Sequence, residues 1–125
     1  MTDVQNIQYK ILIADDKEKE LDMLTGILQN PNYEFIKAHS GDEAHAKILQ
    51  GGLNLIILDD TMPPGPAGSK IAEETRKKDP YTPIVLWSTE LLTYTLRFKD
   101  KNITLIDKGN FGELKEYVNS KLPLI

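Results

Sequence analysis

The sequence predicts an α/β fold in which helices cover both faces of a five-stranded parallel sheet. Short apolar runs alternate along the chain with longer segments of helical spacing, and this alternation is typical of β–α–β units. The runs are apolar at successive positions, as expected for strands that are buried on both faces. Because β–α–β crossovers are right-handed, the connecting helices are expected on both sides of the sheet.

The composition favours one folded domain and excludes several functional classes. The 125 residues are 40% apolar and 27% charged, which predicts a single domain spanning residues 1–125 with its core at about 10–122. The chain contains no cysteine, so disulfide scaffolds and thiolate sites are excluded. A net charge of −4 argues against direct binding of nucleic acid or of an anionic membrane. Neither a secretory signal nor an apolar run of roughly 18 residues is present, and we expect a cytoplasmic protein.

Local signals set the boundaries of most elements. Asn30-Pro31 and Asp79-Pro80 end two helices, and Ser40 with Glu43 has the S-x-x-E pattern of a capping box. Predicted strands cover residues 10–14, 33–38, 53–59, 83–88 and 103–107. Predicted helices cover residues 17–30, 40–50, 69–78 and 110–121.

Residues 89–99 carry conflicting signals. Leu92, Tyr94, Leu96 and Phe98 alternate with polar residues, which is the period of a strand. The β–α rhythm requires a helix here, although three threonines lower the helical propensity. We therefore predict a fourth helix that is short or distorted.

The residues that follow the predicted strands are chemically related. Asp15-Asp16 and Asp59-Asp60 follow two strands, Ser88 ends a third and Lys108 follows the last. Ligands bind at the carboxyl ends of strands in such sheets, so these groups are expected at one edge. Crowded carboxylates repel each other, and a hard divalent cation such as Mg²⁺ relieves the repulsion. A metal, an ammonium group and a hydroxyl group are the components of phosphoryl transfer to a carboxylate.

Two motifs resemble those of the receiver domains of two-component response regulators. Residues 11–16 resemble the apolar strand of that family, which ends in an acidic pair. Residues 58–63 match its D-x-x-M-P motif, and the match identifies Asp59 rather than Asp60 as the phosphoacceptor.

The resemblance continues to the end of the chain. Residues 83–89 match the strand that carries a Thr or Ser, here Ser88, and Lys108 stands where the family has its lysine. The similarity spans residues 10–122 and implies a doubly wound, flavodoxin-like sheet with strand order 2-1-3-4-5.

The family implies a role for each of these residues. Asp59 accepts a phosphoryl group from a phosphohistidine on a sensor histidine kinase or a histidine phosphotransfer protein. Asp15, Asp16, Asp59 and the backbone carbonyl of Thr61 hold Mg²⁺. Such a domain catalyses its own phosphorylation and dephosphorylation and is not a turnover enzyme.

Two further residues respond to the modification in the family. Ser88 bonds to a phosphoryl oxygen, and Lys108 pairs first with Asp59 and then with the phosphoryl group. The added negative charge then alters a protein-interaction face. Tyr94, Arg97 and Tyr117 are expected either on that exposed face or on an ordinary solvated, amphipathic surface.

Departures from the family pattern keep alternatives open. Gly109 stands where the family has Pro, and Leu105 stands where it often has an aromatic residue that moves with the Ser or Thr. These departures motivate a pseudo-receiver, an interaction module that keeps the fold without phosphorylation-driven switching. An aspartyl-phosphate phosphatase is a weaker alternative, because Thr61 stands where such enzymes need a second Asp.

The expected partners are a histidine kinase or phosphotransfer protein and a downstream protein target. The chain fits a free-standing receiver or a piece of a longer regulator or hybrid kinase. It is expected to be a monomer or a weak homodimer.

Overall fold

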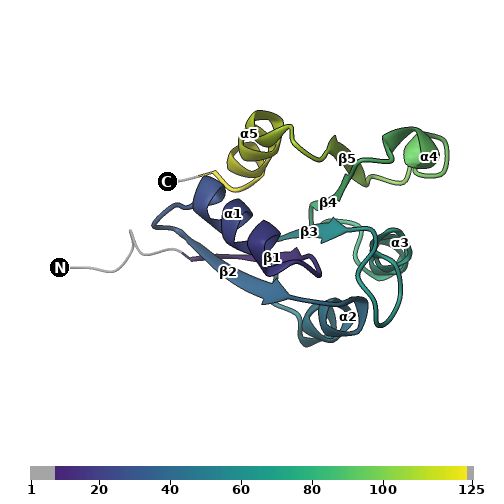
Figure 1. Ribbon diagram of the computed structural model, residues 1–125, viewed down its shortest axis with the longest axis horizontal. Helices are drawn as coiled ribbons and strands as arrows, with labels where there is room; N and C mark the ends of the chain where they lie inside the picture. The colour runs from purple at the N-terminus through teal and green to yellow at the C-terminus, as the bar shows by residue number, and fades with distance from the viewer. Residues whose placement is uncertain (1–7, 124–125) are drawn as a thin grey trace.

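A computed structural model describes residues 8–123 and shows a parallel sheet between two layers of helices (Figure 1). All neighbouring strands are parallel and lie in the order β2-β1-β3-β4-β5, which confirms the predicted topology. The strands are β1 (Tyr9–Ala14), β2 (Tyr33–Ala38), β3 (Leu55–Asp59), β4 (Ile84–Ser88) and β5 (Thr104–Asp107). The helices are α1 (Glu18–Leu28), α2 (Gly41–Gln50), α3 (Gly68–Lys78), α4 (Leu91–Thr95) and α5 (Phe111–Lys121).

The central strands are buried along nearly their whole length. Every residue of β3 and β4 is buried, as are the last four of β1. Their continuous apolar runs are explained by this position, because a central strand of a covered parallel sheet has no solvent-exposed face.

Successive strand residues divide between two hydrophobic cores. One core lies under α1 and α5 and includes Leu24, Trp87 and Leu114. The other lies under α2, α3 and α4 and includes Ile71 and Tyr94. Figure 1 shows α1 and α5 on one side of the sheet and α2 and α3 on the other.

The predicted cap of α2 forms with one difference. The Ser40 hydroxyl accepts a hydrogen bond from the Glu43 N–H at 3.1 Å, as in a capping box. The Glu43 carboxylate accepts from the N–H of His39, not from that of Ser40. The hydrogen bonds that cap α2 therefore extend back to His39, one residue before the Ser40 of the motif.

The fourth helix is short, as predicted. Helix α4 has five residues, and turns continue from it toward β5. Tyr94 and Phe98 are buried with a spacing of four, whereas Leu92 and Leu96 are 92% and 83% exposed. The alternating pattern therefore results from one helical face that is buried and another that is open. The prediction that Tyr94 lies on an exposed face is wrong, since its side chain is 7% exposed.

The two ends of the described chain lie together. The Tyr9 hydroxyl donates to the Pro123 carbonyl at 2.6 Å. Among residues 8–123, the helices are too short or too polar to cross a membrane.

Candidate functional site

The strand register brings the predicted site residues to one edge of the sheet. Ala14 pairs with Leu58, so Asp15 and Asp59 follow side by side at the carboxyl ends of β1 and β3. Ser88, at the end of β4, pairs with Asp107 of β5. Lys108 therefore follows at the carboxyl end of β5, beside the end of β4. Side chains that are far apart in the sequence therefore meet here.

Three carboxylates form a cluster at this edge. Asp15, Asp16 and Asp59 each offer an oxygen that lies within 4.8 Å of the other two. Asp15 is completely buried and Asp59 is 7% exposed, whereas Asp16 is open to solvent. We call these three residues the acidic triad.

Lys108 contacts the buried members of the acidic triad. Its Nζ lies 3.1 Å from Asp59 Oδ1 and 3.3 Å from Asp15 Oδ2, with Glu20 at 3.9 Å. The Lys108 N–H donates to the Ser88 carbonyl at 3.0 Å, which fixes the start of the loop. Gly109 has a φ of +100°, a conformation that residues with a Cβ rarely adopt.

Burial and like charge make this site electrostatically unfavourable for Asp59. Burial raises the pKa of Asp59, and the Asp15 carboxylate raises it further, against the opposing effect of Lys108. Burial lowers the pKa of Lys108, but its hydrogen bonds and charge pairing with Asp59 and Asp15 outweigh this, so the net shift is upward. Lys108 therefore stays charged, but its positive charge does not neutralise all of the negative charge of the acidic triad.

The acidic triad fits a divalent cation. Lys108 pairs with the buried carboxylates and with Glu20, and Lys17 pairs with Asp16 at 3.5 Å. Four carboxylates thus face two ammonium groups, which leaves two negative charges to balance. Mg²⁺ takes one or two carboxylates together with water molecules, and exposed Asp16 leaves the site open to solvent. The donor set and the excess negative charge both favour Mg²⁺ over a soft metal.

The remaining predicted residues have different surroundings. Ser88 is 3% exposed, and its Oγ accepts a hydrogen bond from the Glu90 N–H at 2.9 Å. Thr61 is exposed in the loop after β3. The roles predicted for Ser88 and for the Thr61 carbonyl remain predictions.

Asp60 has two partners that the sequence does not indicate. One of its carboxylate oxygens accepts from the Ser69 N–H at 3.0 Å, and the other accepts from the Tyr94 hydroxyl. Burial raises the pKa of Tyr94, and the bond to Asp60 adds to the increase, so this hydroxyl stays protonated and donates. No sequence pattern indicated the contact, because Tyr94 lies 34 residues after Asp60.

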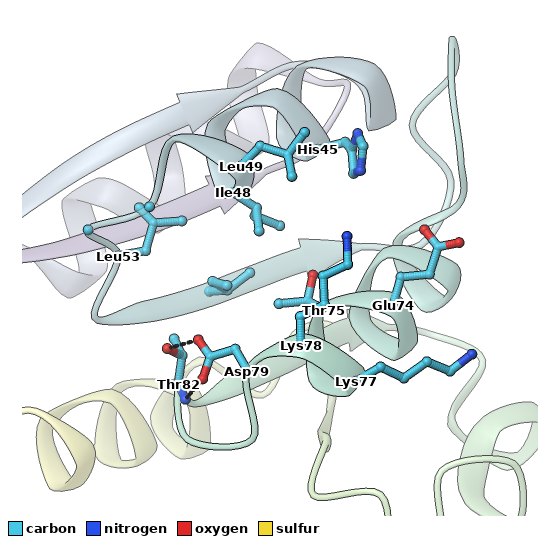
Figure 2. Close-up of a pocket in the computed structure, with 13 residues that line it drawn as sticks. His45, Ile48, Leu49, Leu53, Glu74, Thr75, Lys77, Lys78, Asp79 and Thr82 are labelled. Atoms are coloured by element: carbon cyan, nitrogen blue, oxygen red, sulfur yellow. Dashed lines mark hydrogen bonds between the residues drawn. The ribbon is translucent and has the colours of Figure 1, made fainter.

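A separate groove lies between α2 and α3, near the amino ends of the strands. Figure 2 shows its lining by His45 and Ile48 of α2, Thr75 and Lys78 of α3, and Leu53 before β3. Its volume is about 490 Å³. Because it adjoins the amino ends of β3 and β4, it is not part of the acidic site.

Comparisons with known proteins agree with this geometry. The model of the response regulator receiver domain family matches residues 11–105. The transcriptional regulatory protein ResD of Bacillus subtilis is 38% identical over 82 residues, which are 66% of this chain and 33% of ResD. The chain spans about a third of the length of the curated relatives it matches.

Solved structures of response regulators and receiver domains are also similar to this chain. The response regulator TrrA of Thermotoga maritima, crystallised with Mg²⁺ and beryllofluoride, is 33% identical with a TM-score of 0.79, covering 91% of this chain and 99% of that one. A CheY-like receiver domain of Methanospirillum hungatei is 27% identical with a TM-score of 0.81, covering 92% and 94% of the two chains.

Proposed function

We propose that this chain, which belongs to the response regulator receiver domain family, is a phosphoacceptor switch whose Asp59 takes a phosphoryl group from a partner phosphohistidine. The observation that carries the proposal is the position of Asp59. It is nearly buried at a strand end, between two further carboxylates and the Lys108 ammonium group. An ordinary helix cap or structural acid needs neither a second carboxylate nor a buried cation.

The transfer exchanges one bond for another. An Asp59 carboxylate oxygen attacks phosphorus, the P–O bond forms, and the P–N bond of phosphohistidine breaks. The leaving imidazole keeps the electron pair and takes up a proton. Water later hydrolyses the acyl phosphate to inorganic phosphate and restores the carboxylate, so the domain is a switch and not a turnover enzyme.

The surrounding residues stabilise the transferred group. Mg²⁺, held by Asp15, Asp16, Asp59 and the Thr61 carbonyl, would neutralise charge on the phosphoryl oxygens. Lys108, already 3.1 Å from Asp59, gains the phosphoryl oxygens as partners. Ser88 turns toward another oxygen and donates its hydroxyl proton to it, and this rotation moves Oγ away from the Glu90 N–H, from which it accepts in the present structure.

The proposed partners follow from this chemistry. The phosphoryl donor is a sensor histidine kinase or a histidine phosphotransfer protein, and the output is contact with a downstream protein. We propose that residues 1–125 act as one receiver domain in either a free-standing or a longer protein. Leu105 and Gly109 keep the pseudo-receiver as the second candidate, and the experiment below distinguishes the two.

The test uses phosphoramidate, a small donor with the P–N bond of phosphohistidine. We expect the protein with Mg²⁺ to gain one phosphoryl group by intact mass spectrometry, and chelation of Mg²⁺ to slow the gain at least about tenfold, or ~1.4 kcal/mol of barrier. Asp59→Asn should gain none.

Asp100→Asn is the matched control, because it removes an exposed carboxylate from the loop before β5. It should react as the wild type does. A folded wild-type protein that binds Mg²⁺ but never gains a phosphoryl group would support the pseudo-receiver instead. Equal labelling of Asp59→Asn would show that another residue is the acceptor.

A further inference from the structure

Helix α4 is attached to the loop after β3 by a buried tyrosine. The Tyr94 hydroxyl donates to the Asp60 carboxylate, and its ring stacks on Phe98 with centroids 5.6 Å apart. Arg97 covers both rings and pairs with Glu73 of α3 at 2.6 Å. Tyr94 is thus the member of this group that connects α4 with the acidic edge.

Asp60 transmits this contact to the phosphoacceptor. The other oxygen of its carboxylate binds the Ser69 N–H in the first turn of α3, and its carbonyl accepts from the Gly68 N–H at 2.8 Å. Its own N–H donates to Asp59 Oδ1 at 2.9 Å. The same oxygen faces Lys108 at 3.1 Å. Two hydrogen bonds therefore connect α4 with the acceptor carboxylate.

A second contact holds the start of α4. The Glu90 N–H, one residue before the helix, donates to Ser88 Oγ at 2.9 Å. In the proposed function Ser88 turns to the phosphoryl group and releases this N–H. Of these two contacts, the bond between Tyr94 and Asp60 is then the one that must still break before α4 can leave its present position.

We propose that Tyr94 is a positioning residue that, through Asp60, holds α4 in the arrangement it has before phosphorylation. This inference rests on the proposed function and adds a path from Asp59 to α4. The path runs across the side of the sheet that carries α3 and α4. It uses no aromatic residue of β5, where this chain has Leu105.

Binding linkage gives the sign of the effect. A contact present only before phosphorylation must weaken binding of a phosphoryl mimic, and removing that contact must strengthen binding by the same factor. Coupling of this kind is typically about 5–150-fold. Tyr94→Phe, which loses only the hydroxyl, should therefore lower the Kd for beryllofluoride at least about fivefold.

The measurement is a beryllofluoride titration at saturating Mg²⁺, followed by Trp87 fluorescence. Trp87 precedes Ser88 but packs on Phe111 in the core under α1 and α5, so it reports on the site from the side opposite Tyr94. Tyr33→Phe is the matched control. The Tyr33 side chain is 7% exposed, like that of Tyr94, and its hydroxyl donates to Asn119 Oδ1 at 2.7 Å. Because Tyr33 begins β2, at the amino end of the sheet, the Kd of this variant should equal that of the wild type.

A double-mutant cycle tests whether Tyr94 acts through Asp60. Tyr94→Phe should change the Kd in the wild type and have no further effect in Asp60→Ala, because the acceptor is already lost. A purely structural role for the ring would leave the Kd of Tyr94→Phe unchanged. An unchanged or raised Kd in Tyr94→Phe overturns the inference.

The two failures are distinguishable. If the wild type binds no beryllofluoride, the proposed function fails and the inference fails with it. If the wild type binds but Tyr94→Phe binds equally well, only the inference fails. Should Tyr94→Phe not fold, the test uses the wild-type protein with isotope-labelled tyrosine and follows the NMR signals of the tyrosine Cζ atoms. Beryllofluoride should shift the Tyr94 signal and leave the Tyr33 signal unmoved, and an unmoved Tyr94 signal overturns the inference.

Discussion

Adjacent residues Asp59 and Asp60 have carboxylates in different surroundings. The Asp59 carboxylate meets Lys108 at the carboxyl end of the sheet, whereas that of Asp60 binds Ser69 and Tyr94. Chemistry alone left the two equivalent in the sequence, and only the D-x-x-M-P resemblance distinguished them. The structure supplies a physical difference, since Asp60 has both carboxylate oxygens hydrogen-bonded within the described protein.

His39 provides a prediction about pH at the scale of one residue. Its ring nitrogens lie 2.7 Å from Glu18 and 3.2 Å from Glu43, and the hydrogen bond to Glu18, followed by that to Glu43, raises the pKa of His39. Because the folded pKa exceeds the ordinary value of 6.5, the stabilisation is complete below pH 6.5 and is lost as pH rises through the folded pKa.

Denaturant unfolding of His39→Gln checks this sign. The wild type should be the more stable protein at pH 6, by less than about 1 kcal/mol because the pair is exposed, and the difference should shrink by pH 9. His45→Gln, an exposed change on α2, is the control. The same pH dependence in both variants, or a growing difference at high pH, would contradict the assignment.

At the scale of elements, α4 shows what sequence reasoning missed. The period-two pattern and the expected helix conflicted, and the structure resolves them with a five-residue helix. Tyr94 and Phe98 are inside because they stack on each other and because Tyr94 has a polar acceptor in Asp60. Neither reason is local, so no window around residues 89–99 could have revealed it.

The start of α3 approaches β3 so closely that it tolerates no side chain. A Cβ on Gly68 would lie 1.9 Å from the Asp59 carbonyl oxygen, which is backbone and cannot move aside cheaply. Gly68→Ala should lower the free energy of unfolding by about 1–3 kcal/mol. Urea unfolding followed by circular dichroism measures this loss.

Gly26→Ala is its matched control. Gly26 lies inside α1, and nothing stands within 4 Å of the added Cβ. Alanine should therefore raise the stability by about 0.5–1 kcal/mol, because it restricts the unfolded chain and favours the helix. Equal effects at the two glycines would mean that the close approach of α3 to β3 is not constraining.

At the scale of the whole molecule, most of the architecture was predictable. Apolar runs ending in Asp15-Asp16, Asp59-Asp60 and Ser88 predict parallel strands whose functional ends meet, and all neighbouring strands pair in this way. The contact of Lys108 with both buried carboxylates follows from the same register. Long-range hydrogen bonds such as that between Tyr94 and Asp60 depend on how α4 lies against the loop after β3, which no single segment encodes.

The acidic site is expected to reduce the stability of the metal-free protein. Burial, with the Asp15 charge, raises the pKa of Asp59 above its ordinary 3.8, so the folded state binds this proton more tightly than the unfolded state. Stability therefore falls as pH rises from 3.8 through the folded pKa, and the whole penalty is present above it. Asp59→Asn should remove this penalty and raise the metal-free Tm by a few degrees at pH 7.

Calorimetry with and without Mg²⁺ checks the effect. About 1 kcal/mol corresponds to roughly 3–6 °C in a domain of this size. The gain of Asp59→Asn should fade as pH falls through the raised pKa, and Mg²⁺ should stabilise the wild type more than the variant. A lower Tm for Asp59→Asn in chelator would show that the carboxylate strengthens the fold.

The hydrogen bond between Tyr9 and Pro123 keeps the two ends of the described chain close together, so the ends could be joined and the chain opened elsewhere without changing the fold. A short linker from residue 123 to residue 8, with an opening in the exposed turn at Gly51 and Gly52, would interrupt none of the strands or helices. In this circular permutant β3 is synthesised first, and β1 follows β5 as the fourth strand. Asp59 would then precede Asp15 and Asp16 along the chain, while the three carboxylates keep their places in space.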